Sequence, residues 1–135
     1  MRVLAITGVL LLGVAPAALA DDLRGADRIL CSPAQATACT AEDGCETAPP
    51  WTLNIPTFIK IDLAKKLLGT TEASGENRQT PVSTLLREEG RIYLQGIEGG
   101  RAFSFLIDEA SGLTTVAVAR DNLTVSVFGA CTPLK

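Results

Sequence analysis

Residues 82–128 read VSTLLREEGRIYLQGIEGGRAFSFLIDEASGLTTVAVARDNLTVSVF. The stretch contains five runs of strand length, at 82–87, 91–97, 102–107, 113–118 and 123–128. The separators between these runs carry turn-forming residues, such as Glu89-Gly90 and Gly99-Gly100. Short strands joined at such close spacing predict an antiparallel β-meander, and this meander decides the fold class.

Side chains along these runs alternate in character. Phe103, Phe105 and Ile107 share one face of their run, with Leu106 on the other, and one face of the last run carries Leu123, Val125 and Val127. A repeat of two residues is typical of a strand, whereas a helix repeats every 3.6 residues. Each strand is therefore expected to turn one face toward a core.

Upstream of the meander the pattern is less regular. Residues 58–61, which read FIKI, predict a strand, and 28–31 and 36–40 are further candidates. Residues 62–68 predict a short helix that Asp62 caps and that ends before Gly69. Residues 32–52 predict an irregular segment held by disulfides, and 70–80 a loop.

Together these segments predict an all-β fold: an antiparallel meander of six to eight strands with one short helix near residues 62–68. So many strands in so short a chain are expected to close as a small barrel or to fold over as a sandwich. The reason is that a flat sheet leaves its edges and one of its faces exposed.

Residues 1–20 have the features of an export signal. A basic start at Arg2 precedes an apolar run over 3–14, and Ala18-Leu19-Ala20 forms a cleavage motif before Asp21. The run contains glycine, Pro16 follows it, and no basic flank comes after it, which argues against a membrane anchor. We expect a cleaved signal peptide at 1–20, a single disulfide-stapled β-domain over 21–135 and a periplasmic or secreted location, with no membrane attachment after cleavage.

Four cysteines form an even set, which in an exported protein indicates disulfides. Asp43-Gly44 is a turn dipeptide, and it favours a bond between Cys39 and Cys45. That pairing leaves Cys31 for Cys131, and the bond between them would place the first strand beside the last, as a closed barrel requires. The competing pairing joins Cys31 to Cys39 and Cys45 to Cys131.

Composition and charge argue against several classes of partner. Removal of the leader, which contains Arg2, leaves 11 basic and 15 acidic residues and a side-chain charge of −4. The basic residues form no stripe, and only one Trp and one Tyr are present for stacking, so no nucleic-acid surface is expected. No histidine occurs and the cysteine spacings match no zinc motif, so we expect no metal and no cofactor.

Catalysis has little support in the sequence. Without histidine the commonest general base is absent, and no serine lies in a G-x-S-x-G motif. The alternative hypothesis is a carboxylate-based hydrolytic enzyme, with Asp62, Glu98 or Asp108 acting as acid or base near Arg101. Thiol redox catalysis is a more distant one.

The segment around Gly96 is the most distinctive part of the sequence, because a glycine lies inside a predicted strand. A glycine inside a strand predicts a bulge or a close approach of another group to the backbone, and Arg101 and Phe103 follow the next turn. A site could be built at one end of the sheet. The residues expected to bind ligand there are Trp51, Phe58, Tyr93, Gln95, Arg101 and Phe103, with Phe105 beside them.

The preferred hypothesis is therefore a monomeric, non-enzymatic binding module for a small apolar ligand. A protein partner is the other possible occupant, bound through the irregular amino-terminal segment as small exported protease inhibitors bind theirs. A barrel filled by its own side chains would favour the partner.

Several motifs also suggest a family. The early cysteines with Pro49-Pro50-Trp51, the runs QGIE and GRAFS at 95–98 and 100–104, IDEASGL at 107–113 and the closing FGACTP at 128–133 together resemble small exported proteobacterial β-domain proteins of unassigned function. The resemblance covers nearly all of residues 21–135. It implies a compact periplasmic protein and brings no catalytic residue with it.

Overall fold

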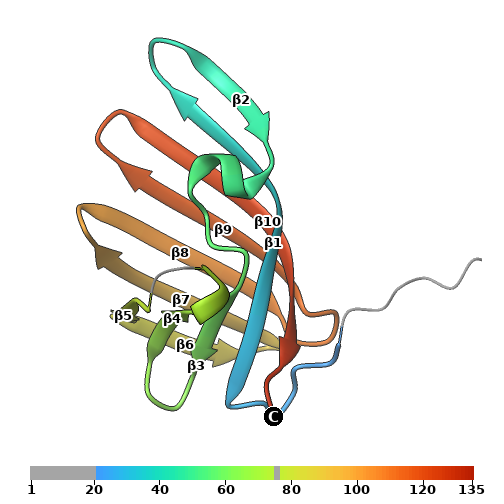
Figure 1. Cartoon of the computed structure of the whole chain (residues 1–135). Helices are drawn as coiled ribbons and strands as arrows, with labels where there is room; N and C mark the ends of the chain where they lie inside the picture. Colours follow the sequence, from blue (N-terminus) through green and yellow to red (C-terminus); the bar gives the residue numbers. More distant parts are fainter. Residues whose placement is uncertain (1–20, 75–76) are drawn as a thin grey trace, which may run out of the picture.

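The computed structural model describes residues 21–74 and 77–135 and contains mainly β-structure (Figure 1). The strands are β1 (Arg28–Thr40), β2 (Gly44–Ala48), β3 (Ile59–Asp62), β4 (Leu67–Thr70), β5 (Gln79–Pro81), β6 (Thr84–Glu88), β7 (Arg91–Glu98), β8 (Arg101–Asp108), β9 (Leu113–Arg120) and β10 (Leu123–Pro133). Two short 3-10 helices, η1 (Pro50–Leu53) and η2 (Glu72–Ser74), interrupt them. Within the described residues, no helix is long and apolar enough to span a membrane.

All strands belong to one antiparallel sheet of 10 strands within the described residues. The order is β5-β4-β3-β1-β10-β9-β8-β7-β6, and β2 pairs with β1 beside this path. The meander predicted for 82–128 is confirmed as the consecutive hairpins from β6 to β10. The sheet is strongly curled and has the shape of a half-barrel (Figure 1).

Strand β1 organises the other half of the sheet. Along one edge it pairs with β10 over nearly its whole length, and along the other it pairs first with β3 and then with β2. Gly129 lies opposite Pro33, where an added Cβ would come within 3.1 Å of the Pro33 Cα atom. Only glycine fits at position 129, because any Cβ atom there would clash with β1. The register of β1 against β10 shifts directly after this pair, between Pro33 and Gln35.

Both disulfides are cross-strand bonds between directly paired residues. Cys31 faces Cys131 across β1 and β10, and Cys39 faces Cys45 across β1 and β2. The pairing favoured by the turn dipeptide is therefore the one present, and the first and last long strands lie side by side as that pairing requires.

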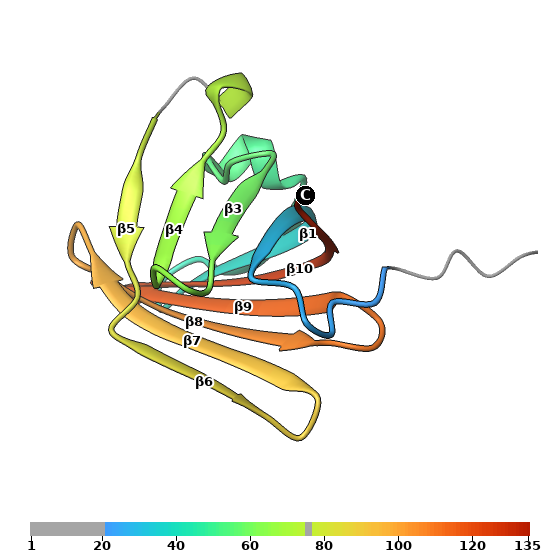
Figure 2. The same cartoon turned by 90° about the horizontal axis from the view of Figure 1, so that it is seen from below.

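Strands β3, β4 and β5 fold back over the concave side of the sheet (Figure 2). Strand β5 then leads directly into β6 at the opposite end of the strand order. In the link, Val82 N–H donates to the Lys66 carbonyl at 2.9 Å, and Ser83 N–H donates to the Gln95 carbonyl at 2.8 Å. The two ends of the curled sheet therefore meet at this link, without pairing between β5 and β6 in the described structure.

The predictions for the amino-terminal half are only partly met. The strand candidates 28–31 and 36–40 are confirmed within β1, and the sheet has 10 strands within the described residues where six to eight were expected. The irregular segment predicted for 32–52 is wrong, because this stretch contains most of β1, all of β2 and most of η1. The added strands form because β10 and the disulfides provide pairing partners that local composition does not reveal. The segment 70–80, predicted as a loop, contains η2 and β5, and its residues 75–76 lie outside the described residues, as does the predicted signal peptide 1–20.

The predicted helix at 62–68 is also wrong, because the segment is a hairpin turn between β3 and β4. Asp62 does cap backbone there, since its Oδ1 accepts the Lys65 N–H at 2.8 Å. Lys66 adopts a left-handed conformation with φ of 54°, which reverses the chain. Leu68 then packs into the core as a strand residue, so pairing with β3 outweighs the local helical pattern.

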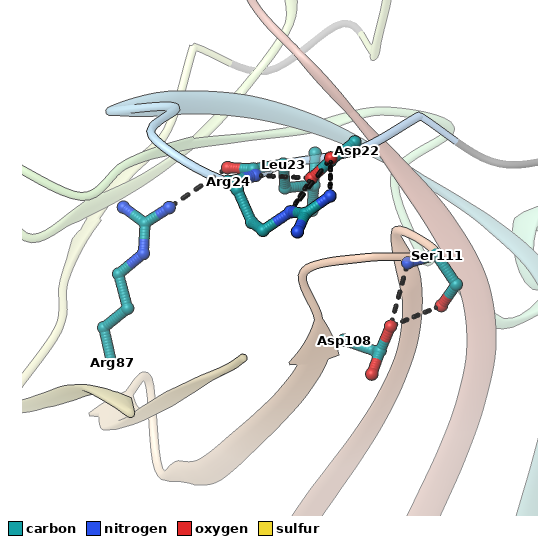
Figure 3. A network of polar contacts seen from close by, with 6 residues as sticks. All are labelled: Asp22, Leu23, Arg24, Arg87, Asp108 and Ser111. Atoms are coloured by element: carbon teal, nitrogen blue, oxygen red, sulfur yellow. Dashed lines mark hydrogen bonds and ion pairs between the residues drawn. The ribbon is translucent and has the colours of Figure 1, made fainter. Parts of the chain in front are cut away.

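The core fills one end of the curled sheet. Leu23, Ile29, Ile61, Ile92, Leu94 and Ile107 are all fully buried. Residues 21–26 lie across this end, which we call the closed end. Arg87 holds them there by donating to the Leu23 carbonyl at 3.0 Å (Figure 3). It also donates to the Ala26 carbonyl at 3.0 Å and forms an ion pair with Glu109.

Candidate ligand-binding cavity

A cavity of about 240 Å³ lies on the concave side of the sheet. Strands β8, β9 and β10 form one wall, and β3, β4 and β5 form the other, with residues 53–56 after η1 beside them. The mouth lies at the end of the sheet with the turns Gly99-Gly100 and Asp121-Asn122, opposite the closed end, and we call it the open end.

The walls are mainly apolar because apolar side chains alternate with polar ones along the strands of the meander, and the apolar ones point inward. Inward-facing side chains of β9 and β10 meet those of β3 and β4, and the principal ones are Ile59, Leu68, Val116, Val118, Val125 and Val127. The faces predicted for 102–107 and 123–128 are confirmed: Phe105 and Val127 are buried, whereas Leu106 and Thr124 are exposed. The cavity is therefore the part of the interior that the core residues leave unfilled.

Phe103 determines the shape of the cavity beside β7. Its ring lies over Gly96, where an added Cβ would come within 2.9 Å of Phe103 Cε1. The ring also meets Phe105 edge to face, with 6.0 Å between the ring centroids. The close approach predicted at Gly96 is therefore present, and its partner is an aromatic side chain that also lines the cavity.

Charged side chains surround the mouth. Arg78, Glu98, Arg101 and Arg120 all line the cavity, and Arg78 Nε lies 3.3 Å from Glu98 Oε1. Arg101 and Arg120 form no ion pair with any described residue. The cavity thus has apolar walls and a rim with two uncompensated cations, in a protein whose overall charge is negative.

A second hollow of about 260 Å³ lies beside β3 and β4 and has a more polar lining. Arg28, Lys60, Asp62 and Lys65 are among its lining residues. It offers little enclosed apolar surface, and we assign no ligand to it.

Only some of the residues predicted to bind ligand line the cavity. Arg101 and Phe103 line the cavity, as does Phe105. Tyr93 and Gln95 lie on the opposite face of β7 from the buried Ile92 and Leu94, because successive side chains of a strand point to opposite sides. They therefore cannot share the concave site with Arg101.

The two aromatic residues predicted upstream also lie outside the lining. Trp51 projects from η1 with 71% of its surface exposed, and Phe58 is half-buried just before β3. The valines of β9 and β10 and Arg120 line the cavity and were not predicted from the sequence. The alternation of 113–128 could have identified them, because it places these side chains on the same face as Phe103 once the strands pair.

The three carboxylates of the enzyme hypothesis do not converge. Glu98 lies at the open end and pairs with Arg78, whereas Asp108 lies at the other end of β8. The Asp108 carboxylate accepts the backbone N–H and hydroxyl of Ser111, both at 2.8 Å, and these hydrogen bonds lower its pKa (Figure 3). Asp62 caps the β3–β4 turn.

All four cysteines are in disulfides, and none of them lines the cavity. Near the closed end, Arg24 donates hydrogen bonds to Asp22 and lowers the pKa of that carboxyl to about 2 (Figure 3). This pair is exposed and lies away from the cavity. Of the two hollows described above, the apolar cavity is the candidate ligand site.

Comparison with protein-family models, with curated proteins and with solved structures finds no match to this chain. Its function is therefore inferred from the cavity and the residues around it.

Proposed function

We propose that this is a non-enzymatic periplasmic or secreted protein that binds a small apolar ligand in the concave cavity. The observation that carries the proposal is the unfilled apolar space between the two walls of the sheet. Its volume, about 240 Å³, lies just below the range of about 300–1,000 Å³ that is typical of sites for small molecules. The ligand is accordingly small, or places only its apolar part inside.

The construction of the protein supports this proposal. The disulfide between Cys31 and Cys131 joins the strands at the corner of the two walls, and the 82–83 link joins the far edges. A cavity held open by a rigid frame spares the ligand the cost of ordering the protein. Two disulfides also suit an oxidising compartment.

The experiment uses octan-1-ol as a neutral apolar probe and methyl NMR of residues 21–135 as the readout. Octan-1-ol is expected to shift the methyl signals of Val116, Val118 and Val125 and to leave those of exposed Leu113 unchanged. Val118→Phe fills the cavity and should weaken binding about tenfold or more, because the apolar tail loses its space.

The matched control is Ala117→Phe. Ala117 is the neighbour of Val118 on β9 but faces the exposed side, so this variant adds the same ring outside the cavity. It should bind octan-1-ol as the unmodified chain does. Unchanged valine signals up to the solubility limit of the alcohol, or equal binding by both variants, would contradict the proposal.

The second candidate is a protein partner, a second copy of this chain, bound through the convex face instead of the amino-terminal segment, and one observation favours it. On the convex face, register places Leu86, Tyr93, Leu106, Thr115 and Phe128 side by side across five strands. Leu106 and Phe128 are 42% and 51% exposed. Leu86 is 45% exposed, so three of the five side chains in the row are apolar and exposed, and exposed apolar patches are typical of contact surfaces between proteins.

The row can be tested by its effect on self-association. If a second copy binds there, the chain should sediment as a larger species at high concentration, and Leu106→Glu should restore the monomer. Sedimentation as a monomer at all concentrations would exclude self-association through this row.

A further inference from the structure

The rim of the cavity shows which chemical class of ligand the site takes. We infer that the ligand is an amphiphilic anion with one apolar tail, whose head group is held by Arg101 and Arg120 while the tail occupies the cavity. The inference rests on the proposed function and adds the identity of the head group.

The first step is the placement of the two arginines. The register of β8 and β9 pairs Ala102 with Ala119, so Arg101 and Arg120 follow as neighbours at the open end of the two strands. Both side chains line the cavity. Two like charges placed opposite each other across a strand pair destabilise a sheet, and a bound anion between them would remove that cost.

The second step is the charge balance at the mouth. Glu98 is the acid that lines the cavity, and Arg78 already pairs with it at 3.3 Å. Asp121 follows Arg120 in the turn and is exposed, but it does not line the cavity. The described part of the rim therefore presents two cations whose charge no ion pair offsets.

The third step is the junction between charge and apolar surface. Arg101 and Phe103 lie two residues apart on β8 and point to the same side, as do Arg120 and Val118 on β9. A guanidinium binds an oxyanion by directed, charge-assisted hydrogen bonds. A ligand whose anionic head adjoins its tail would thus meet the arginines at the rim and the phenylalanine and valines within.

The experiment compares three probes with the same tail: octanoate, octan-1-ol and octylamine, each titrated at neutral pH into residues 21–135. Octanoate should bind about tenfold tighter than octan-1-ol, since a charged hydrogen bond contributes about that factor or more. Octylamine should bind more weakly than the alcohol. Added salt should reduce the preference for octanoate because the rim is partly exposed.

Variants then locate the preference. Arg101→Gln with Arg120→Gln should bring octanoate to within about twofold of octan-1-ol while binding of the alcohol is retained. Arg91→Gln is the control, because it removes the same charge at the opposite end of β7. It should keep the full preference.

The outcomes separate the two proposals. Binding of octan-1-ol as tight as that of octanoate would overturn the anionic head group and leave the apolar cavity standing. Failure of all three probes would overturn the cavity function, and the inference with it. Loss of the preference in Arg91→Gln would attribute it to overall charge and overturn the assignment to the rim.

A second measurement does not depend on the probe. Without ligand, Arg101→Gln and Arg120→Gln should each raise the melting temperature, since each removes repulsion between neighbouring cations. A lower melting temperature in both would assign the arginines a structural role and contradict the proposal.

Discussion

Arg87 and Glu109 lie 22 residues apart and form an ion pair that anchors residues 21–26 across the closed end of the sheet. Glu109 is buried, with 7% of its surface exposed, and its own carbonyl accepts the Leu23 N–H at 2.7 Å. The guanidinium also satisfies two carbonyls of the amino-terminal segment. The pair therefore joins three parts of the chain at the end opposite the cavity mouth.

The first prediction concerns this pair. Arg87→Ala should lower the free energy of unfolding by about 3 kcal/mol, because it leaves the Glu109 carboxylate buried without its partner. Arg91→Ala, at an exposed site at the start of β7, should change it by less than about 0.5 kcal/mol. Urea denaturation of both variants provides the measurement. Equal stabilities would show that Arg87 does not hold the closed end.

The two disulfides should differ in their contribution to stability. The bond between Cys31 and Cys131 spans a sequence separation of 100, and the bond between Cys39 and Cys45 spans 6. Replacing the first pair by alanine should cost about 4–5 kcal/mol, and replacing the second about 2 kcal/mol, because a longer loop restricts the unfolded chain more. Denaturation of the two double variants tests this order, and the reverse order would contradict it.

Gly96 should be sensitive to the smallest added side chain. Gly96→Ala should destabilise the protein by about 1–3 kcal/mol, because the new methyl group meets the Phe103 ring. Phe103→Leu in the same chain should recover part of this loss, giving a coupling of about 1 kcal/mol or more in a double-mutant cycle. Strictly additive effects would show that the two residues do not compete for the same space.

Asp108 should contribute stability that depends on pH. Its pKa is lower in the folded protein than in the unfolded chain, where an aspartate has a pKa of about 3.9. Its contribution is therefore fully present above that value and is lost as the pH falls through the lower folded pKa. Asp108→Asn should be less stable than the unmodified chain at pH 7, and the difference should shrink below about pH 4.

Two variants complete this test. Ser111→Ala removes the hydroxyl donor and should reduce the same pH-dependent contribution. Asp121→Asn, changed at an exposed turn residue, controls for the loss of one negative charge. A difference between Asp108→Asn and the unmodified chain that is the same at pH 7 and pH 3 would contradict the prediction.

Sequence reasoning succeeded where structure is local. In 91–128 the alternation and the glycine-containing turns describe strands that pair with their sequence neighbours, so each hairpin follows from its own residues. The favoured cysteine pairing is present for a related reason, since Asp43-Gly44 folds the chain between Cys39 and Cys45. The prediction for 62–68 was wrong. The leucines there are spaced as in a helix, but pairing of β4 with β3 makes the segment a hairpin turn.

Only some of the residues that line the cavity could be predicted from the sequence. Arg101 and Phe103 were identified from their own segment, but Tyr93 and Gln95 were grouped with them although they point to the other side of the sheet. Arg120 was missed because the alternation of 113–128 assigns its face but not the residue beside it. Its relation to Arg101 exists only through the register of β8 against β9.

The sequence by itself determined that this chain forms antiparallel hairpins with one apolar face, because a two-residue period and turn residues act over short distances. Only the tertiary structure decided how that face is used. The long-range pairing of β1 with β10 and the folding back of β3 to β5 set the distance between the walls. Side chains fill the interior at the closed end, and a cavity remains at the open end. There the register of β8 and β9 places Arg101 and Arg120, 19 positions apart in the sequence, on neighbouring strands.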